Sequence, residues 1–222
     1  MPLNANALTT YAAVLDDLEL EEPADESERS RLQRRIERAI NAASAAIVEY
    51  CHREFARGVV TEKLTGGGVR LVVARRPVLA VSAFSFGGVA LPLDALEIED
   101  AEAGILLVRR GLPAHALAGF GVLDEGLAGF EPPDYSVTYE GGYTLPNSGA
   151  GYTLPATVEE ACIMTATTAY HSRGENRRVA SESLPDYSVQ YVGANSAIGR
   201  GLAGIIPDEA AAALANYVIP VM

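Results

Sequence analysis

One long amphipathic helix constrains this chain more than any other feature of its sequence. From Leu32 to Phe55, apolar side chains recur at steps of three and four residues, which is the spacing of one face of an α-helix. Asp25 can cap the first turn, with Glu28 three residues later as in a capping box, and Gly58 is a natural stop. The pattern predicts a helix over residues 25–58, with arginines on the face opposite the apolar stripe.

Two nearly identical hexapeptides flank a second predicted helix. Residues 134–139 and 186–191 both place Tyr, Val and Tyr on alternate positions, the period of a half-buried strand. The two strands could pair in one sheet, or the repeat could be chance, since Tyr and Val are both good strand formers. Pro155 opens the helix between them and Gly174 ends it. Its predicted buried positions are Val158, Cys162, Thr165, Ala166 and Ala169.

The remaining segments are shorter. Residues 59–65, 69–74 and 78–86 are predicted strands, the first two joined by a hairpin turn at residues 66–68, and residues 96–98 and 105–108 form a second hairpin. A short helix capped by Thr9 precedes the long one, another follows Pro207, and residues 111–133 form a long loop. We therefore expect an α+β fold with a helical body of two long helices plus short terminal helices. Its expected divisions are an N-terminal helical part (1–58), a β-rich insertion with the long loop (59–133), a strand–helix–strand segment completing the body (134–192), and an extended C-terminal arm (193–222).

The charge balance argues against a protein that binds nucleic acid tightly. The chain of 222 residues has 17 Lys and Arg against 29 Asp and Glu, a net charge of −12. Attraction to DNA phosphates needs clustered basic side chains. Three arginine pairs interrupt this acidic background, and they could touch DNA, pair with acidic groups of a neighbouring subunit, or remain solvated. These pairs are Arg75–Arg76, Arg109–Arg110 and Arg177–Arg178. We see no secretory signal and no apolar stretch that reaches membrane-spanning length.

A search for chemistry finds no converging set of reactive groups. The histidines are His52, His115 and His171, far apart in the sequence and without metal-ligand spacing. Cys51 and Cys162 are predicted to be buried apolar residues. An acidic patch could bind a cation, although a solvated hairpin edge is the favoured interpretation; its members are Glu97, Glu99, Asp100 and Glu102. We predict no catalytic residue, cofactor or metal, with a small acidic hydrolase as the less favoured alternative.

Several short segments occur in a distinctive order along the chain: Leu8-Thr9-Thr10, residues 47–55, Arg75-Arg76-Pro77, residues 137–143, the helix end at Tyr170 to Arg173, and Ile206-Pro207. In these segments and their order, the chain resembles the phage head-tail connector (adaptor) proteins. The resemblance covers nearly the whole chain, and the order of the segments is more specific than any one of them. The loop at residues 111–133, the doubled Tyr-Thr-Leu-Pro and the apolar tail depart from the family pattern.

The resemblance implies a structural virion protein without enzyme activity. Such proteins form a ring, commonly of twelve subunits, that docks on the portal protein, extends the DNA channel and provides a platform for the next neck or tail protein. The chain would then belong to the neck of a tailed phage and be present in the host cytoplasm during assembly. A head-completion stopper or a tail terminator is the alternative within the neck.

Two sets of contact residues follow as expectations. Ring contacts between subunits are expected at Arg31, Arg34, Arg35, Arg38, Arg177 and Arg178. The portal-docking arm is expected to use Ile206, Pro207, Leu214, Tyr217, Val218, Ile219, Val221 and Met222. Glycines at positions 193, 199, 201 and 204 would keep this arm disordered before binding, so deleting residues 217–222 should leave the melting temperature unchanged and abolish attachment to portal-bearing heads. DNA should pass through the ring without tight binding.

Overall fold

The chain divides into two compact units, a helical unit and a β unit. The computed structural model describes residues 2–64, 70–109, 135–149, 151–172, 181–184, 187–190 and 205–219. The helical unit comprises Met1–Arg53 and Thr144–Met222, and the β unit is Glu54–Tyr143. In the sequence, the β unit thus lies between the two halves of the helical unit, and the combination of helices with antiparallel sheets confirms the predicted α+β class.

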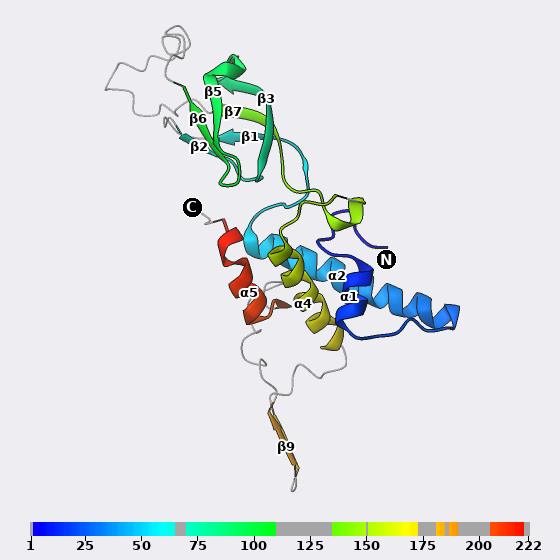
Figure 1. Cartoon of the computed structure of the whole chain (residues 1–222). Coiled ribbons are helices and arrows are strands. Elements are labelled where there is room, and N and C mark those ends of the chain that lie inside the picture. Colours follow the sequence, from blue (N-terminus) through cyan, green and yellow to red (C-terminus); the bar gives the residue numbers. More distant parts are fainter. Residues whose placement is uncertain are drawn as a thin grey trace. The chain divides into compact units, whose positions relative to one another are not determined.

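Among the described residues, four α-helices build the helical unit (Figure 1). They are α1 (Tyr11–Asp17), α2 (Glu26–Cys51), α4 (Ala156–His171) and α5 (Asp208–Leu214), with short 3-10 helices η2 (Pro146–Ser148) and η4 (Ala215–Tyr217). Helix α4 packs against α1, α2 and α5 and is therefore the centre of the unit. All five positions predicted to be buried on α4 are buried, and the apolar stripe of α2 is buried from Ile36 to Cys51.

The N-terminal cap of α1 and the C-terminal end of α2 both differ from the sequence prediction. The cap of α1 is Thr10, whose Oγ1 accepts from Ala13 N at 3.2 Å, whereas Thr9 is fully buried. Helix α2 ends at Cys51 rather than near Gly58, because His52 adopts a left-handed conformation with φ 51°. Phe55 is buried, but it belongs to the β unit and not to the helix. The apolar spacing therefore continued past the residue at which the backbone leaves the helix.

In the part of the chain that the structure describes, nine strands form three antiparallel sheets. The four-stranded sheet has the order β1 (Gly58–Leu64), β7 (Tyr135–Gly141), β3 (Val78–Phe86), β4 (Val89–Ala90). A three-stranded sheet has the order β2 (Arg70–Val72), β6 (Ile105–Val108), β5 (Leu96–Asp100), which follows the short helix η1 (Leu93–Ala95). In the helical unit, β8 (Ser181–Leu184) pairs with β9 (Tyr187–Gln190). The hairpin predicted for residues 96–108 is confirmed by the pairing of β5 with β6.

Long-range pairing overturns three of the strand predictions. The two tyrosine strands do not pair, because β7 lies between β1 and β3 whereas β9 pairs with β8. Strands β1 and β2 do not form a hairpin, since they belong to different sheets. The predicted strand–helix–strand segment is also divided, because β7 belongs to the β unit and α4 to the helical unit. The loop at residues 111–133 lies outside the described residues.

The core of the β unit is formed by the inward-facing side chains of both its sheets. Phe84 and Tyr135 stack with ring centroids 5.7 Å apart, and Phe86 meets the same tyrosine at 4.7 Å. Buried aliphatic side chains from β2, β3, β6 and β7 complete this core. The Tyr, Val, Tyr alternation of the first hexapeptide is thus a burial pattern, with Tyr135, Val137 and Tyr139 all facing inward.

Candidate subunit interface

The reactive side chains are dispersed over the described part of the chain. His52 lies at the end of α2 and His171 at the end of α4, while His115 lies outside the described residues. Burial raises the pKa of the Cys51 thiol to about 11 and that of Cys162 to about 12, so both are protonated at neutral pH. Within the described ranges, no three His, Cys, Asp or Glu side chains are grouped closely enough to hold a metal ion.

The acidic patch on the β5–β6 hairpin is largely neutralised by its own unit. Glu97 accepts from Arg109 at 3.1 Å, and Glu99 forms a two-point hydrogen bond with Arg70. The hydrogen bond from Arg70 holds the pKa of Glu99 below its usual value. This arrangement is that of a solvated hairpin edge, which was the favoured interpretation of the patch.

The remaining two acidic residues of the patch also have partners. Asp100 accepts from the backbone N–H of Ala103 at 2.9 Å, and Glu102 accepts from the hydroxyl of Tyr143 at 3.1 Å. All four carboxylates of the hairpin are thus engaged by donors of the β unit.

A row of exposed arginines is the most distinctive surface feature of the helical unit. Arg31, Arg34, Arg35 and Arg38, here called the arginine stripe, lie at i, i+3, i+4 and i+7 on α2 and therefore share one face. All four are exposed. Among the described residues, no carboxylate lies within 4.0 Å of any of them, although five other ion pairs form elsewhere.

One member of the stripe is held in place by an aromatic ring. The guanidinium of Arg35 lies 5.0 Å from the ring centroid of Tyr170 on α4, a cation–π distance. Tyr170 in turn meets the His171 ring edge-on at 5.7 Å. The contact orders Arg35 without neutralising it, so the stripe keeps its positive charge.

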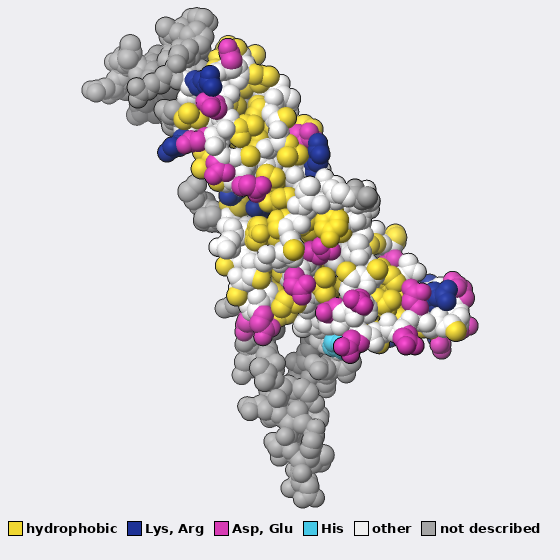
Figure 2. Space-filling view, in the orientation of Figure 1, with side chains coloured by type: hydrophobic (Ala, Val, Ile, Leu, Met, Phe, Trp, Pro, Cys, Tyr) yellow, Lys and Arg dark blue, Asp and Glu magenta, His cyan; other side chains and the backbone are white. Residues whose placement is uncertain are grey.

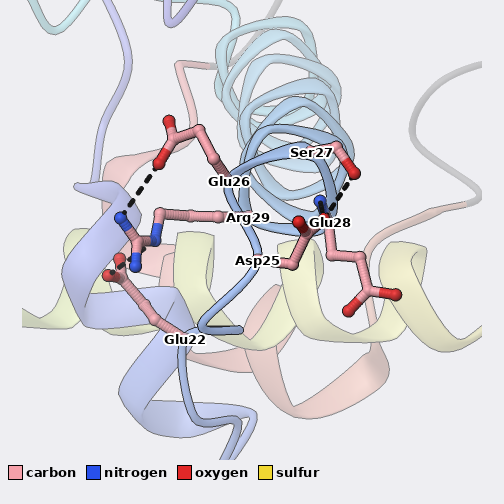
Figure 3. A network of polar contacts seen from close by, with 6 residues as sticks. All are labelled: Glu22, Asp25, Glu26, Ser27, Glu28 and Arg29. Carbon is pink, nitrogen blue, oxygen red and sulfur yellow. Dashed lines mark hydrogen bonds and ion pairs between the residues drawn. The ribbon is translucent and has the colours of Figure 1, made fainter.

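The polar side chains around the first turn of α2 bond one another (Figure 3). Asp25 Oδ2 accepts from the backbone N–H of Glu28 at 3.0 Å and also from the Ser27 hydroxyl. Arg29 bonds Glu26 at 3.2 Å and lies 3.7 Å from Glu22. These interactions satisfy the helix start and Arg29 locally.

The C-terminal segment packs on its own subunit. Helix α5 contacts α4, and both Ala210 and Leu214 are fully buried. The backbone N–H of Ile219 donates to the carbonyl oxygen of Cys51 at 3.0 Å, which satisfies one of the last carbonyls of α2. Leu214, which was expected to anchor the arm to the portal, thus has its side chain in the core of its own subunit.

The other residues of the expected docking arm are only partly covered. Half-buried side chains occur at Ile206, Pro207, Tyr217, Val218 and Ile219. Residues 205–219 are placed as part of the helical unit, so the expectation of a wholly disordered arm is wrong for this stretch. Val221, Met222, Arg177 and Arg178 lie outside the described residues.

The start of α5 carries an acidic flank. Asp208 and Glu209 begin α5 and are both exposed. Helix α4 lies between α5 and the N-terminal half of α2 that carries the stripe (Figure 1). Figure 2 shows acidic side chains spread over the visible face of the helices, with basic ones confined to few places. Sequence reasoning missed this flank, since Asp and Glu in a first turn are ordinary helix-start residues.

The fold has a counterpart among solved structures. A chain of the structure "Neck of empty GTA particle computed with C6 symmetry" matches with a TM-score of 0.50 and 16% identity, and the match covers 100% of this chain and 95% of that chain. No protein-family model and no curated protein matches the sequence. Among the described helices, none combines the length and apolar character needed to cross a bilayer. The likeness shows that the two chains share an overall fold.

Proposed function

We propose that this chain is a structural neck protein of a tailed phage or phage-like particle, and that it is the connector (adaptor). In this role it forms a ring that docks on the portal protein, extends the DNA channel and supports the next neck or tail protein. The observation that carries the proposal is the match of the complete chain to a chain of a neck structure. The ordered sequence segments that resemble connector proteins support the same role.

The ring is proposed to contain twelve subunits. The neck that contains the similar chain was computed with C6 symmetry. A ring of twelve is compatible with sixfold symmetry, because two subunits can occupy each repeat. Closed rings use contacts in which one patch of a subunit meets a different patch of its neighbour. The arginine stripe, together with Arg177 and Arg178, is proposed to contribute to these contacts.

Weak affinity for DNA is part of the proposal. A channel wall must let DNA pass, and in the helical unit acidic side chains outnumber basic ones. Nanomolar binding of the free protein to duplex DNA at physiological salt, measured by gel shift, would contradict this conduit role.

The portal contact is proposed to use the partly covered apolar residues of the C-terminal segment. Tyr217, Val218 and Ile219 present apolar surface next to the end of α2. Val221 and Met222 extend the same apolar run in the sequence. Several weak arms acting together around a ring would attach it firmly.

A cryo-EM map of the particle that carries this chain tests the function directly. The expected result is a ring of this fold between the portal and the next neck or tail protein. A position below a separate ring that contacts the portal would instead identify a stopper or a tail terminator. Particles purified to homogeneity that lack the chain altogether would overturn the neck assignment.

A genetic experiment supplies a second test. Removal of the gene should give DNA-filled heads without tails, and purified protein added to these heads should restore tail joining. Tailed, infectious particles formed without the protein would contradict the proposal.

A further inference from the structure

The arginine stripe has no carboxylate partner within the described part of its own subunit, and the helical unit carries a matching acidic surface. The stripe presents four exposed guanidinium groups on one face of α2. Asp208 and Glu209 present two exposed carboxylates at the start of α5. No described cation lies within 4.0 Å of either carboxylate. The two surfaces are complementary in charge and separated by α4.

We infer that the arginine stripe of one subunit binds the acidic start of α5, at Asp208 and Glu209, in the next copy of this chain. This inference rests on the proposed ring and names the two surfaces that meet in it. Helix α4 contacts both α2 and α5 and lies between them (Figure 1), and no ion pair joins the two surfaces within the described part of one subunit. A contact between two different patches repeats from copy to copy and can close into a ring.

The geometry favours a protein partner over DNA. Arg35 is oriented by Tyr170, so part of the stripe is ordered before any partner binds. The acidic residues Glu22, Asp25, Glu26 and Glu28 lie at the start of the same helix and would repel a phosphate backbone. A small acidic patch on a second copy can meet the stripe without approaching that end of the helix.

Exposed ion pairs are individually weak and are screened by salt. Free subunits should therefore associate transiently, and a covalent trap is the suitable assay. The test variant combines Arg34→Cys with Glu209→Cys in the full chain. The native thiols do not interfere, because Cys51 and Cys162 are buried and remain protonated at the pH of the oxidation. Oxidation is expected to give a ladder of dimers, trimers and higher species on a denaturing gel.

Two controls make this result specific. Each single substitution should give dimers at most, since a ladder needs both surfaces in one chain. The pair Glu21→Cys and Glu49→Cys places two thiols at other exposed positions of the helical unit and should give no ladder. A test variant that is folded by circular dichroism and gives no more ladder than this control pair would overturn the inference.

Charge reversal in the double-cysteine test variant examines whether the contact between subunits depends on charge. Adding Arg31→Glu and Arg38→Glu should reduce the ladder severalfold, and further addition of Asp208→Arg should restore most of it. Reduction without restoration would show that the stripe meets some other surface and would overturn the assignment of Asp208 and Glu209.

A DNA-binding outcome would also overturn the inference. If the wild-type protein shifts a duplex of thirty base pairs at physiological salt, and Arg34→Glu with Arg38→Glu abolishes that shift, the stripe is a DNA contact. The location of the chain in the particle remains a separate measurement. A neck ring seen by cryo-EM together with an absent ladder would reject this contact while leaving the proposed function intact.

Discussion

The hydroxyl of Tyr139 donates a hydrogen bond of 2.6 Å to Oε1 of Glu62 and accepts one of 2.9 Å from the backbone N–H of Arg75. The second carboxylate oxygen of Glu62 accepts from the backbone N–H of Ala74 at 3.0 Å. Tyr139 lies on β7, Glu62 on β1 and the two amides on the segment that follows β2. The pair thus joins the two large sheets of the β unit through one fully buried phenol.

Replacement of Tyr139 by Phe should destabilise the β unit by about 1–3 kcal/mol, because it removes a hydrogen bond to a carboxylate and leaves the amide of Arg75 without this acceptor. Urea denaturation would measure the change in the free energy of unfolding. Tyr135→Phe is the matched control on the same strand, since no described group bonds the Tyr135 hydroxyl, and its effect should be smaller. Equal effects of the two substitutions would show that the network contributes little.

The N-terminal cap of α2 should depend on the ionised side chain of Asp25. Hydrogen bonds from the Ser27 hydroxyl and the Glu28 amide lower the pKa of Asp25. A lowered folded-state pKa means that the stabilisation is present above the unfolded value of 3.8 and is lost as the pH falls through the folded value. Asp25→Ala should therefore lower the melting temperature at pH 7 and have less effect below pH 3.

Asp25→Asn is the control for the cap. The Asn side chain keeps an oxygen that can accept from the Glu28 amide, so this variant should retain more of the melting temperature than Asp25→Ala. An Asn variant as unstable as the Ala variant at pH 7 would assign the effect to charge rather than to the capping bond.

Alkaline pH should destabilise the helical unit through its two thiols. Burial raises the pKa of Cys51 and Cys162 above the unfolded value of 9.0, to about 11 and about 12. Between pH 9 and pH 11 the folded state therefore holds protons that the unfolded state releases. The free energy of unfolding should fall as the pH rises through this window, by up to about 1.4 kcal/mol per pH unit for each thiol.

Denaturant titrations at several pH values would measure this slope. The double variant Cys51→Ala and Cys162→Ala should be less stable at pH 7 but should show a shallower slope above pH 9. An unchanged slope in the variant would assign the alkaline effect to other groups, such as the buried tyrosines.

Deletion of residues 217–222 should lower the melting temperature of the isolated protein. The structure reverses the expectation drawn from the sequence, because Ile219 bonds the carbonyl of Cys51 and Tyr217 and Val218 are half-buried. Loss of this partial apolar burial should cost about 2 kcal/mol or more. Calorimetry on the truncated and complete chains would measure the change, and an unchanged melting temperature would support a free arm.

Backbone crowding makes Gly142 the most restrictive glycine in the β unit. Gly142 has φ 97°, and a Cβ there would lie 2.6 Å from the carbonyl oxygen of Ala56. Gly149 has a similar φ of 104° but open space around it. Gly142→Ala should therefore lower the melting temperature much more than Gly149→Ala, and equal effects would show that the positive φ alone limits both positions.

Local patterning in the sequence determined the helices and one hairpin of this protein. The buried stripe of α4, the buried stripe of α2 from Ile36 onward, and the turn between β5 and β6 all follow from side-chain spacing and turn residues. Spacing also placed the arginine stripe on one face of α2. These features depend on contacts within a few residues, so a short window of sequence contains the needed information.

Tertiary structure decided the features that depend on distant partners. Two hexapeptides share the same Tyr, Val, Tyr alternation, but the first became the central strand β7 and the second became β9 in a separate two-stranded sheet. Their pairing differs because β7 lies between β1 and β3, whereas β9 pairs with β8. Leu214 became a core residue only because α5 packs on α4, and Arg35 was ordered only because Tyr170 lies beside it. Asp208 and Glu209 became candidates for a subunit contact for the same reason. Their position across α4 from the arginines arises from helix packing, which periodicity in the sequence does not encode.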